Sequence, residues 1–134
     1  MKFFIIKIVT KALALIAFFI TMGTAHGAEW FVGKTVVKKA TWYGQEFHGR
    51  LMANGERFNM HDPLVVAHKT LPKGSLLLVR NVANGKNLVV KVKDRGPYNK
   101  DPNVVLDLSY AGAEMLGYVH EGKAILEITV LKLG

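Results

Sequence analysis

An aspartate stands at the end of an apolar run, in a position where a side chain can do acid–base chemistry. Val90 and Val92 lie two residues apart, so in a strand they share one face, and Asp94 continues that face because side chains alternate with period two. The four residues from Asp94 are Asp-Arg-Gly-Pro, which is typical of a turn. We therefore expect a half-buried general acid at the rim of a sheet or barrel, the alternative being an aspartate that only caps its own turn.

Two other residues are candidates for the same chemistry. Glu56 lies in a polar loop. If it lies near Asp94, repulsion between the two carboxylates would raise the pKa of one of them, so that one carries a proton and the other is an anion. The alternative interpretation of Glu56 is a solvated glutamate that pairs with Arg57. His68 shares a strand face with Val66 and is expected near the rim, where it would orient the acid or hold a substrate hydroxyl. A structural, hydrogen-bonded histidine is the other interpretation of His68.

Other kinds of site have little support. The histidines outside the leader show no ligand spacing, and the chain has no cysteine, so we expect no metal and no cofactor. There is no Gly-x-Ser-x-Gly motif and no glycine-rich phosphate loop, which argues against acyl and phosphoryl transfer.

Aromatic residues surround the polar loop and are candidates for stacking on sugar rings. Trp42, Tyr43, Phe47 and Phe58 flank it, and about half of them are expected in the core. We expect Tyr43 and Tyr98 to be the most exposed of the aromatic candidates.

The rest of the chain predicts a mainly β domain with six short strands and one short helix. Strands are expected at residues 36–43, 64–68, 75–82, 87–93, 104–108 and 124–131, and the helix at 110–116. Ser109 is a plausible N-cap of the helix and Gly117 its stop, while Asn84-Gly85 favours a two-residue hairpin turn. We expect residues 44–63 to form a long loop. Six short strands without edge protection favour a closed barrel over an open sheet.

The first 27 residues have the pattern of a secretory signal peptide. Lysines precede an apolar run at residues 13–22, and Ala25-His26-Gly27 offers a cleavage site, although a retained anchor is the alternative. Cleavage would leave residues 28–134 as one exported domain in the periplasm or cell wall, with no stable membrane insertion. The 18 lysines and arginines include three in the leader, which leaves 15 against 10 acids. That mild positive charge suits an anionic polymer, or serves solubility alone, and the scattered lysines argue against nucleic acid.

Several segments together resemble a known family, the rare lipoprotein A (RlpA-like) domain, from about residue 38 to the C-terminus. The segments are Ala40-Thr41-Trp42-Tyr43-Gly44, Phe47-His48-Gly49-Arg50, Ala53-Asn54-Gly55-Glu56-Arg57-Phe58, Ala67-His68-Lys69-Thr70-Leu71-Pro72, Asp94-Arg95-Gly96-Pro97-Tyr98 and Asp107-Leu108-Ser109.

The resemblance implies a six-stranded double-psi β-barrel, as in expansins, and action on peptidoglycan glycan strands. Members of the family are endolytic lytic transglycosylases that cut MurNAc–GlcNAc linkages in strands without stem peptides and leave 1,6-anhydroMurNAc ends. By the same resemblance Asp94, His68 and Glu56 are the catalytic residues, with Asp94 as the acid that expansins share. The substrate-binding positions it implies are Tyr43, Asn54, Thr70, Arg95 and Tyr98.

Two alternatives remain open for the function. Asn59 stands where the family usually has aspartate, and the span from Glu56 to His68 is one residue longer than usual, with Asp62 inside it. These departures keep a non-catalytic, expansin-like wall-binding module in view, and a secreted protein that binds another protein through residues 44–63 is the third hypothesis. We expect a monomer in each case.

Overall fold

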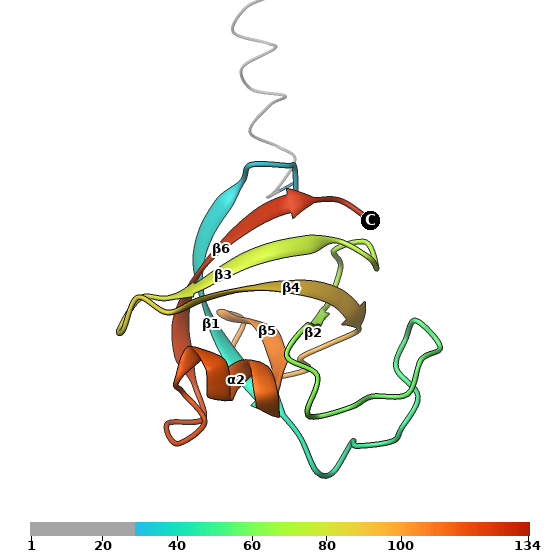
Figure 1. Ribbon diagram of the computed structural model, residues 1–134. Coiled ribbons are helices and arrows are strands. Elements are labelled where there is room, and N and C mark those ends of the chain that lie inside the picture. Colours follow the sequence, from blue (N-terminus) through green and yellow to red (C-terminus); the bar gives the residue numbers. More distant parts are fainter. Residues whose placement is uncertain (1–28) are drawn as a thin grey trace, which may run out of the picture.

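The computed structural model describes residues 29–134, so the predicted signal peptide lies outside the described residues. Six strands and one helix follow one another along the chain (Figure 1). They are β1 (Thr35–Tyr43), β2 (Val65–His68), β3 (Leu76–Asn81), β4 (Asn87–Asp94), β5 (Val104–Ser109), α2 (Tyr110–Leu116) and β6 (Ala124–Lys132). Each predicted strand and the predicted helix is present, with bounds that differ by one residue at most at either end. No helix in this part of the chain has the length and apolar character needed to cross a bilayer.

The six strands close into a barrel, as predicted. Around the barrel their order is β1-β5-β2-β4-β3-β6. β1 pairs with β5 and β2 pairs with β4 in parallel, whereas the other neighbours are antiparallel. Closure leaves no free sheet edge, which is how short strands of this kind avoid pairing with other chains.

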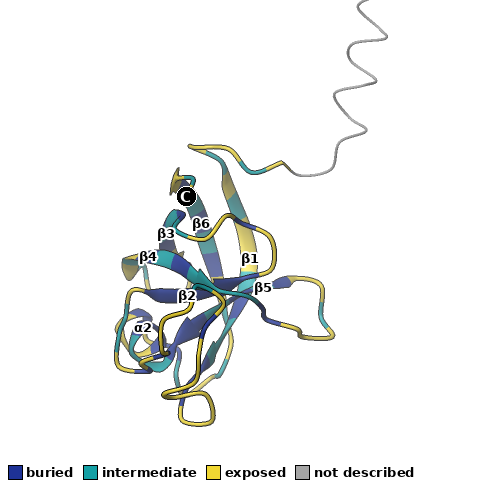
Figure 2. Ribbon diagram, turned by 90° about the vertical axis from the view of Figure 1, so that its right-hand side faces the viewer, coloured by how far each residue is buried: buried dark blue, intermediate teal, exposed yellow. Residues whose placement is uncertain are grey.

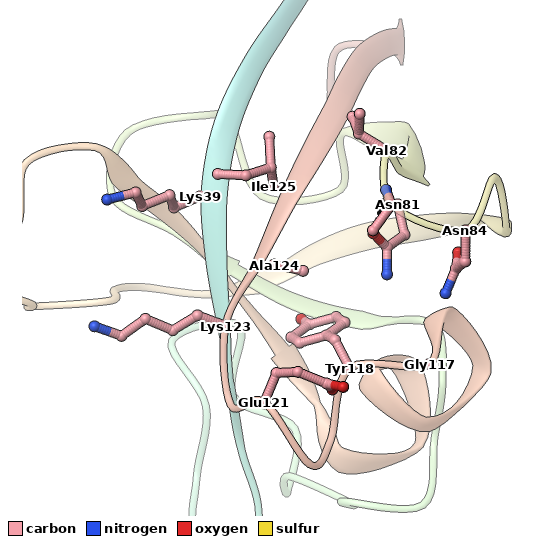
Figure 3. Close-up of a pocket in the computed structure, with 11 residues that line it drawn as sticks. Lys39, Asn81, Val82, Asn84, Gly117, Tyr118, Glu121, Lys123, Ala124 and Ile125 are labelled. Atoms are coloured by element: carbon pink, nitrogen blue, oxygen red, sulfur yellow. Dashed lines mark hydrogen bonds between the residues drawn. The ribbon is translucent and has the colours of Figure 1, made fainter.

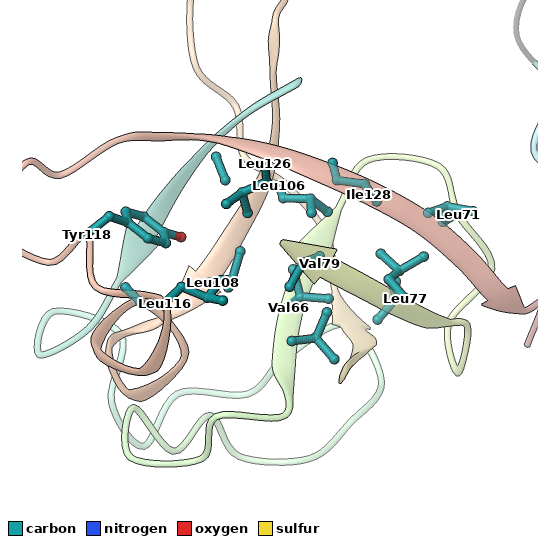
Figure 4. Packing of buried hydrophobic residues seen from close by; sticks show 14 of the residues in the cluster. Val66, Leu71, Leu77, Val79, Leu106, Leu108, Leu116, Tyr118, Leu126 and Ile128 are labelled. Carbon is teal, nitrogen blue, oxygen red and sulfur yellow. The ribbon is translucent and has the colours of Figure 1, made fainter. Parts of the chain in front are cut away.

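The barrel interior is filled by one apolar cluster, to which every strand contributes (Figure 4). In β6 the alternation is plain: Leu126, Ile128 and Val130 point inward and are fully buried, while Ile125 lies outside. Figure 2 shows that burial differs between strands: β2 is buried along its whole length, whereas β1 has exposed residues, in yellow, near its start.

The helix α2 is bounded by the two predicted residues, the N-cap Ser109 and the stop Gly117. The Ser109 hydroxyl accepts a hydrogen bond from the Gly112 amide, and Gly117 takes the left-handed conformation at φ 75°. Its amide returns to the carbonyls of Ala113 and Glu114. A serine N-cap and a glycine stop are the two signals that make a seven-residue helix readable from sequence.

The β3–β4 hairpin is present, but the predicted two-residue turn is wrong. The Asn81 amide donates to the Lys86 carbonyl at 2.8 Å, so four residues lie between them, with Gly85 at φ 75°. The turn is longer because Asn81 is used elsewhere. Its buried amide side chain donates to the Leu116 carbonyl at 2.8 Å and accepts from the Ala83 amide at 3.1 Å.

We expect Asn81→Ala to lower the free energy of unfolding by about 2 kcal/mol, because it removes a buried side chain that joins the hairpin to the end of α2. Thermal or urea unfolding measures the loss. Asn84→Ala is the matched comparison: exposed Asn84 also donates to Leu116, and its removal should cost less. Equal losses in the two variants would contradict this account.

Candidate active site

The long loop of residues 44–63 covers one outer face of the barrel and has a small core of its own. The amides of Gly49 and Phe58 donate to Phe58 and Arg50 carbonyls, each at 2.8 Å, and Leu51 and Arg57 form an isolated bridge. The apolar residues beneath the loop form a second cluster, separate from the barrel interior: Tyr43, Met52, Phe58, Met60, Val65 and Ala67. The predicted loop is confirmed, and its packing fixes the groups beside it.

Asp94 does not share the face of Val90 and Val92, so that prediction is wrong. The pairing of β2 with β4 shifts register: Val66 lies opposite Val92, but the next residue, Ala67, lies opposite Asp94. The extra residue in β4 is a β-bulge, and a bulge turns the side chain after it to the other face. Asp94 therefore lies on the outer face, next to the loop and away from the barrel interior.

Three donors hold the Asp94 carboxylate. The Tyr43 hydroxyl donates to Oδ2 at 3.2 Å, and the amides of Ala53 and Arg95 donate to Oδ1, each at 2.9 Å. The turn-capping and the site interpretations of Asp94 are thus compatible. The carboxylate caps its own turn through Arg95 and is at the same time anchored to the loop and to β1.

Tyr43 is buried, contrary to the expectation that it would be exposed. Its ring stacks on Phe58, with centroids 4.1 Å apart and planes at 12°. Burial raises the pKa of the Tyr43 hydroxyl, and the carboxylates of Asp94 and Asp107 raise it further. Tyr43 is therefore a neutral hydrogen-bond donor that lies near two acids.

Asp107 is the acid that sequence reasoning left without a role. It lies on β5 opposite Thr41, whose hydroxyl donates to Oδ1 at 3.1 Å. Burial raises the pKa of the Asp107 carboxyl to about 6; the Thr41 hydrogen bond acts against this rise and the Asp94 charge adds to it. The sequence signal was available, because Asp107 alternates with inward-facing Leu106 and Leu108 and so had to lie on the outer face.

A cleft of about 450 Å³ opens beside these residues. Asp107 and Tyr43 contribute to its wall, together with the start of the loop and Tyr110 from α2. A larger pocket, about 660 Å³, lies between the β3–β4 turn and the start of β6 (Figure 3), and neither Asp94 nor Asp107 lines it. The smaller cleft is the candidate active site, because a carboxyl with a raised pKa and the neighbouring Tyr43 line it.

His68 is on the interior face with Val66, as predicted, and its side chain is buried. Nδ1 accepts from the amides of Thr70 and Leu71, at 3.0 and 2.9 Å, and the ring packs edge-on to Trp30 at 5.2 Å. Burial, followed by nearby positive charge, lowers the His68 pKa to about 4. The imidazole is therefore neutral and holds a turn, and its contacts do not join it to Asp94.

Glu56 is exposed and forms its ion pair with Lys93, at 3.0 Å, rather than with Arg57. Lys93 lowers the Glu56 pKa, first by its hydrogen bond and then by its charge. Because Lys93 precedes Asp94 in β4, the pair places Glu56 at the edge of the same outer region. Asn54 braces this part of the loop, since its Oδ1 accepts from the Glu56 amide at 2.9 Å.

The remaining expected binding residues differ in what they can offer. Arg95 Nη1 donates to the carbonyls of His68 and Leu71, at 3.1 and 2.7 Å, so it is largely engaged within the fold. Thr70 is exposed at the same turn, and Tyr98 is 82% exposed, as expected. Within residues 29–134, no three histidine, aspartate or glutamate side chains gather in a way that would hold a metal ion.

The barrel and its acid-lined cleft define a small, mainly β domain with the site on the outer wall. Residues 35–128 match the family model described as lytic transglycolase, and the chain belongs to this family, whose domain is the RlpA-like double-psi β-barrel.

Curated relatives share this domain at high identity. The probable endolytic peptidoglycan transglycosylase RlpA of Aquifex aeolicus (strain VF5) is 50% identical over 95 residues, which cover 71% of this chain and 41% of the relative. The endolytic peptidoglycan transglycosylase RlpA of Vibrio cholerae is 46% identical over 99 residues, covering 74% of this chain and 36% of the relative. The chain thus spans about two fifths of the length of these relatives.

Two solved structures have the same fold at low identity. The Streptomyces papain inhibitor superposes with a TM-score of 0.60 at 22% identity and covers 78% of this chain and all of its own. The Clavibacter michiganensis expansin gives 0.57 at 21% identity, covering 74% of this chain and 51% of its own. At such identities the likeness establishes the barrel alone.

Proposed function

We propose that this protein is an endolytic lytic transglycosylase that cuts MurNAc–GlcNAc linkages in peptide-free peptidoglycan strands and leaves 1,6-anhydroMurNAc ends. The relatives that share the domain are named as endolytic peptidoglycan transglycosylases, one of them as probable. The observation that carries the proposal is the Asp107 carboxyl, which lines the cleft with a pKa raised to about 6. A carboxyl of that kind retains part of its proton near neutral pH, as a general acid requires.

The reaction needs one proton relay and no water. Asp107 gives its proton to the departing GlcNAc oxygen as the bond to the MurNAc anomeric carbon breaks. The C6 hydroxyl of the same MurNAc then bonds to that carbon, and its proton passes to the Asp107 carboxylate, which restores the acid. This differs from an inverting hydrolase, which needs a separate base to activate a water.

Two observations support Asp107 rather than Asp94 as the proton carrier. Burial favours the protonated form of Asp107, whereas the Asp94 oxygens are engaged by three donors. Asp94 would then act through position, because it accepts the hydrogen bond of the Tyr43 hydroxyl and Tyr43 lines the cleft. His68 would support this arrangement only through the turn that it holds.

We propose that the reaction takes place outside the cytoplasmic membrane, in the periplasm or cell wall. The support is the leader pattern of residues 1–27 and the proposed substrate, which lies there. The substrate is the only partner that the proposed reaction requires.

Purified protein incubated with denuded glycan strands should release fragments with 1,6-anhydro ends, which mass spectrometry distinguishes from hydrolysis products by one water. Asp107→Asn serves as the control. Strands that stay intact while the protein still binds them would reject the enzyme and favour the non-catalytic wall-binding module.

We expect Glu56→Gln to reduce turnover less than tenfold, because the lowered pKa of Glu56 leaves it without a proton to give and its visible role is to pair with Lys93. Initial rates on denuded strands test this. The matched variant is Glu121→Gln, an exposed glutamate that lines the other pocket and not the cleft, and it should leave turnover unchanged. A loss of a hundredfold or more in Glu56→Gln would give Glu56 a direct catalytic role.

A further inference from the structure

Of the aromatic residues that flank the long loop, Phe47 keeps a large part of its ring in solvent. It is 42% exposed, whereas Tyr43 and Phe58 are buried and Trp42 is partly buried. Phe47 lines the cleft that also contains Asp107. Its ring is held edge-on by Tyr43, with centroids 5.8 Å apart and planes at 65°. Phe47 therefore offers a fixed apolar surface at the mouth of the cleft.

An arginine lies over this ring. The Arg50 guanidinium carbon is 5.5 Å from the Phe47 centroid. The backbone of Arg50 is fixed, because its amide donates to the Phe47 carbonyl and its carbonyl accepts from the Phe58 amide. Within residues 29–134 no hydrogen bond or ion pair engages the guanidinium itself, whereas Arg57 and Arg95 both donate to backbone carbonyls. Arg50 thus has its planar fork of donors free beside the exposed ring.

This pair of groups suits a sugar that carries a carboxylate. The apolar face of a pyranose packs on an aromatic ring, and a guanidinium binds a carboxylate through two parallel hydrogen bonds. In wall glycan the muramyl sugar carries such a group on its lactyl ether, free when no peptide is attached, and the N-acetylglucosamine does not. We propose that Phe47 and Arg50 form a subsite for the muramyl sugar of the strand, an inference that rests on the proposed function.

Such a subsite has a consequence for the linkage that is cut. Carboxylate-bearing and neutral sugars alternate along the glycan strand. A site that binds only one of them therefore fixes the register, that is, how the glycan strand is positioned along the cleft. Register decides which of the two alternating linkages reaches Asp107. Phe47 and Arg50 would thereby direct cleavage to the bond on one side of the muramyl sugar, without touching the proton that is transferred.

Binding measurements test the subsite without turnover. The Asp107→Asn protein is titrated with peptide-free strands and with the same strands after their lactyl carboxylates have been converted to amides. Amidation should weaken binding about tenfold, and adding Arg50→Gln should weaken binding of the free strands about tenfold while leaving the amidated strands unaffected. Adding Phe47→Leu should weaken both ligands about fivefold.

Arg80→Gln is the matched control, since it removes the same charge from an exposed arginine on β3 and should leave the preference intact. Arg50→Lys, which keeps the charge but loses the fork, should restore only part of the preference. Thermal unfolding verifies that each variant is folded, as expected for exposed positions. The proposal is overturned if Arg50→Gln keeps the preference for free strands, or if Arg80→Gln loses it equally.

The two proposals fail in different ways. If wild-type protein prefers free strands through Arg50 but yields no anhydro products, the proposed subsite stands and the proposed reaction is rejected. If the Arg50→Gln protein yields anhydro products with unchanged affinity and unchanged linkage choice, the proposed reaction stands and the proposed subsite is rejected.

Discussion

Asp107→Asn is expected to lower turnover on denuded glycan strands by a hundredfold or more, because it removes the proposed proton carrier and leaves its shape. Positioned acids contribute about 10²- to 10⁴-fold to rates. Asparagine can still accept the Thr41 hydrogen bond, so the strand pairing at this point should survive. Initial rates, measured by the release of 1,6-anhydro ends, give the loss directly.

The pH profile separates a lost acid from a damaged fold. With an Asp107 pKa of about 6, activity should fall as pH rises through that value, since the carboxyl loses the proton that it must donate. Asp94→Asn should also slow the reaction but keep this alkaline limb. If Asp94→Asn alone abolishes the limb, or Asp107→Asn keeps a tenth of the activity, the assignment is wrong.

Asp101→Asn is the matched control for charge. Asp101 lies outside the cleft and pairs with Lys39 at 3.1 Å, and a backbone hydrogen bond from Asn103 followed by that pair lowers its pKa. Its replacement removes one carboxylate from the same barrel and should leave turnover near the wild-type value. A comparable loss in both variants would point to net charge rather than to a proton donor.

The elements of the fold were predictable where local chemistry decides them. Alternation of apolar residues predicted β6, and Ser109 and Gly117 predicted the ends of α2. These signals work because strand faces and helix caps depend on residues within one element. The turn after Asn81 was predicted wrongly, since a contact with Leu116, far along the chain, decides how Asn81 is used.

The site was predictable only in part, for the same reason. Asp94 was singled out correctly as a residue held at a turn, but the bulge that moves it to the outer face depends on how β2 pairs with β4. Burial of Tyr43 follows from Phe58, which the loop brings back over the barrel. Asp107 had a readable position on the outer face of β5, yet its importance arises from the burial that the assembled cleft imposes.

His68→Asn is expected to remain active and to change how stability depends on pH, because His68 holds a turn and the proposed mechanism gives it no proton to transfer. An asparagine oxygen can accept from the amides of Thr70 and Leu71 in place of Nδ1. His68→Phe offers no acceptor and should cost about 2 kcal/mol of unfolding free energy. If His68→Asn folds well but loses activity a hundredfold, the catalytic role implied by the family resemblance is correct after all.

Folding shifts the pKa values of His68 and Asp107 in opposite directions, and both shifts make stability depend on pH. The His68 pKa is 6.5 when unfolded and about 4 when folded, so the unfolded state binds the proton more readily and stability is lost as pH falls from 6.5 to about 4. Asp107 acts in the opposite sense. Its pKa rises from 3.8 to about 6 on folding, so stability is lost as pH rises across that range. Each effect amounts to about 3 kcal/mol at its full extent.

In the wild-type protein these two effects nearly cancel between about pH 4 and pH 6, and the single variants should uncover them. Stability of Asp107→Asn should fall as pH is lowered through this window, whereas stability of His68→Asn should rise. Glu56 and Asp101, whose pKa values are lowered, add an acid-side loss that is common to both variants and cancels when their curves are subtracted. Urea unfolding across the window gives the two slopes. The difference, Asp107→Asn minus His68→Asn, should fall as pH is lowered through the window. A difference that is flat or rises would mean that one of the two buried groups is not in the protonation state that its surroundings favour.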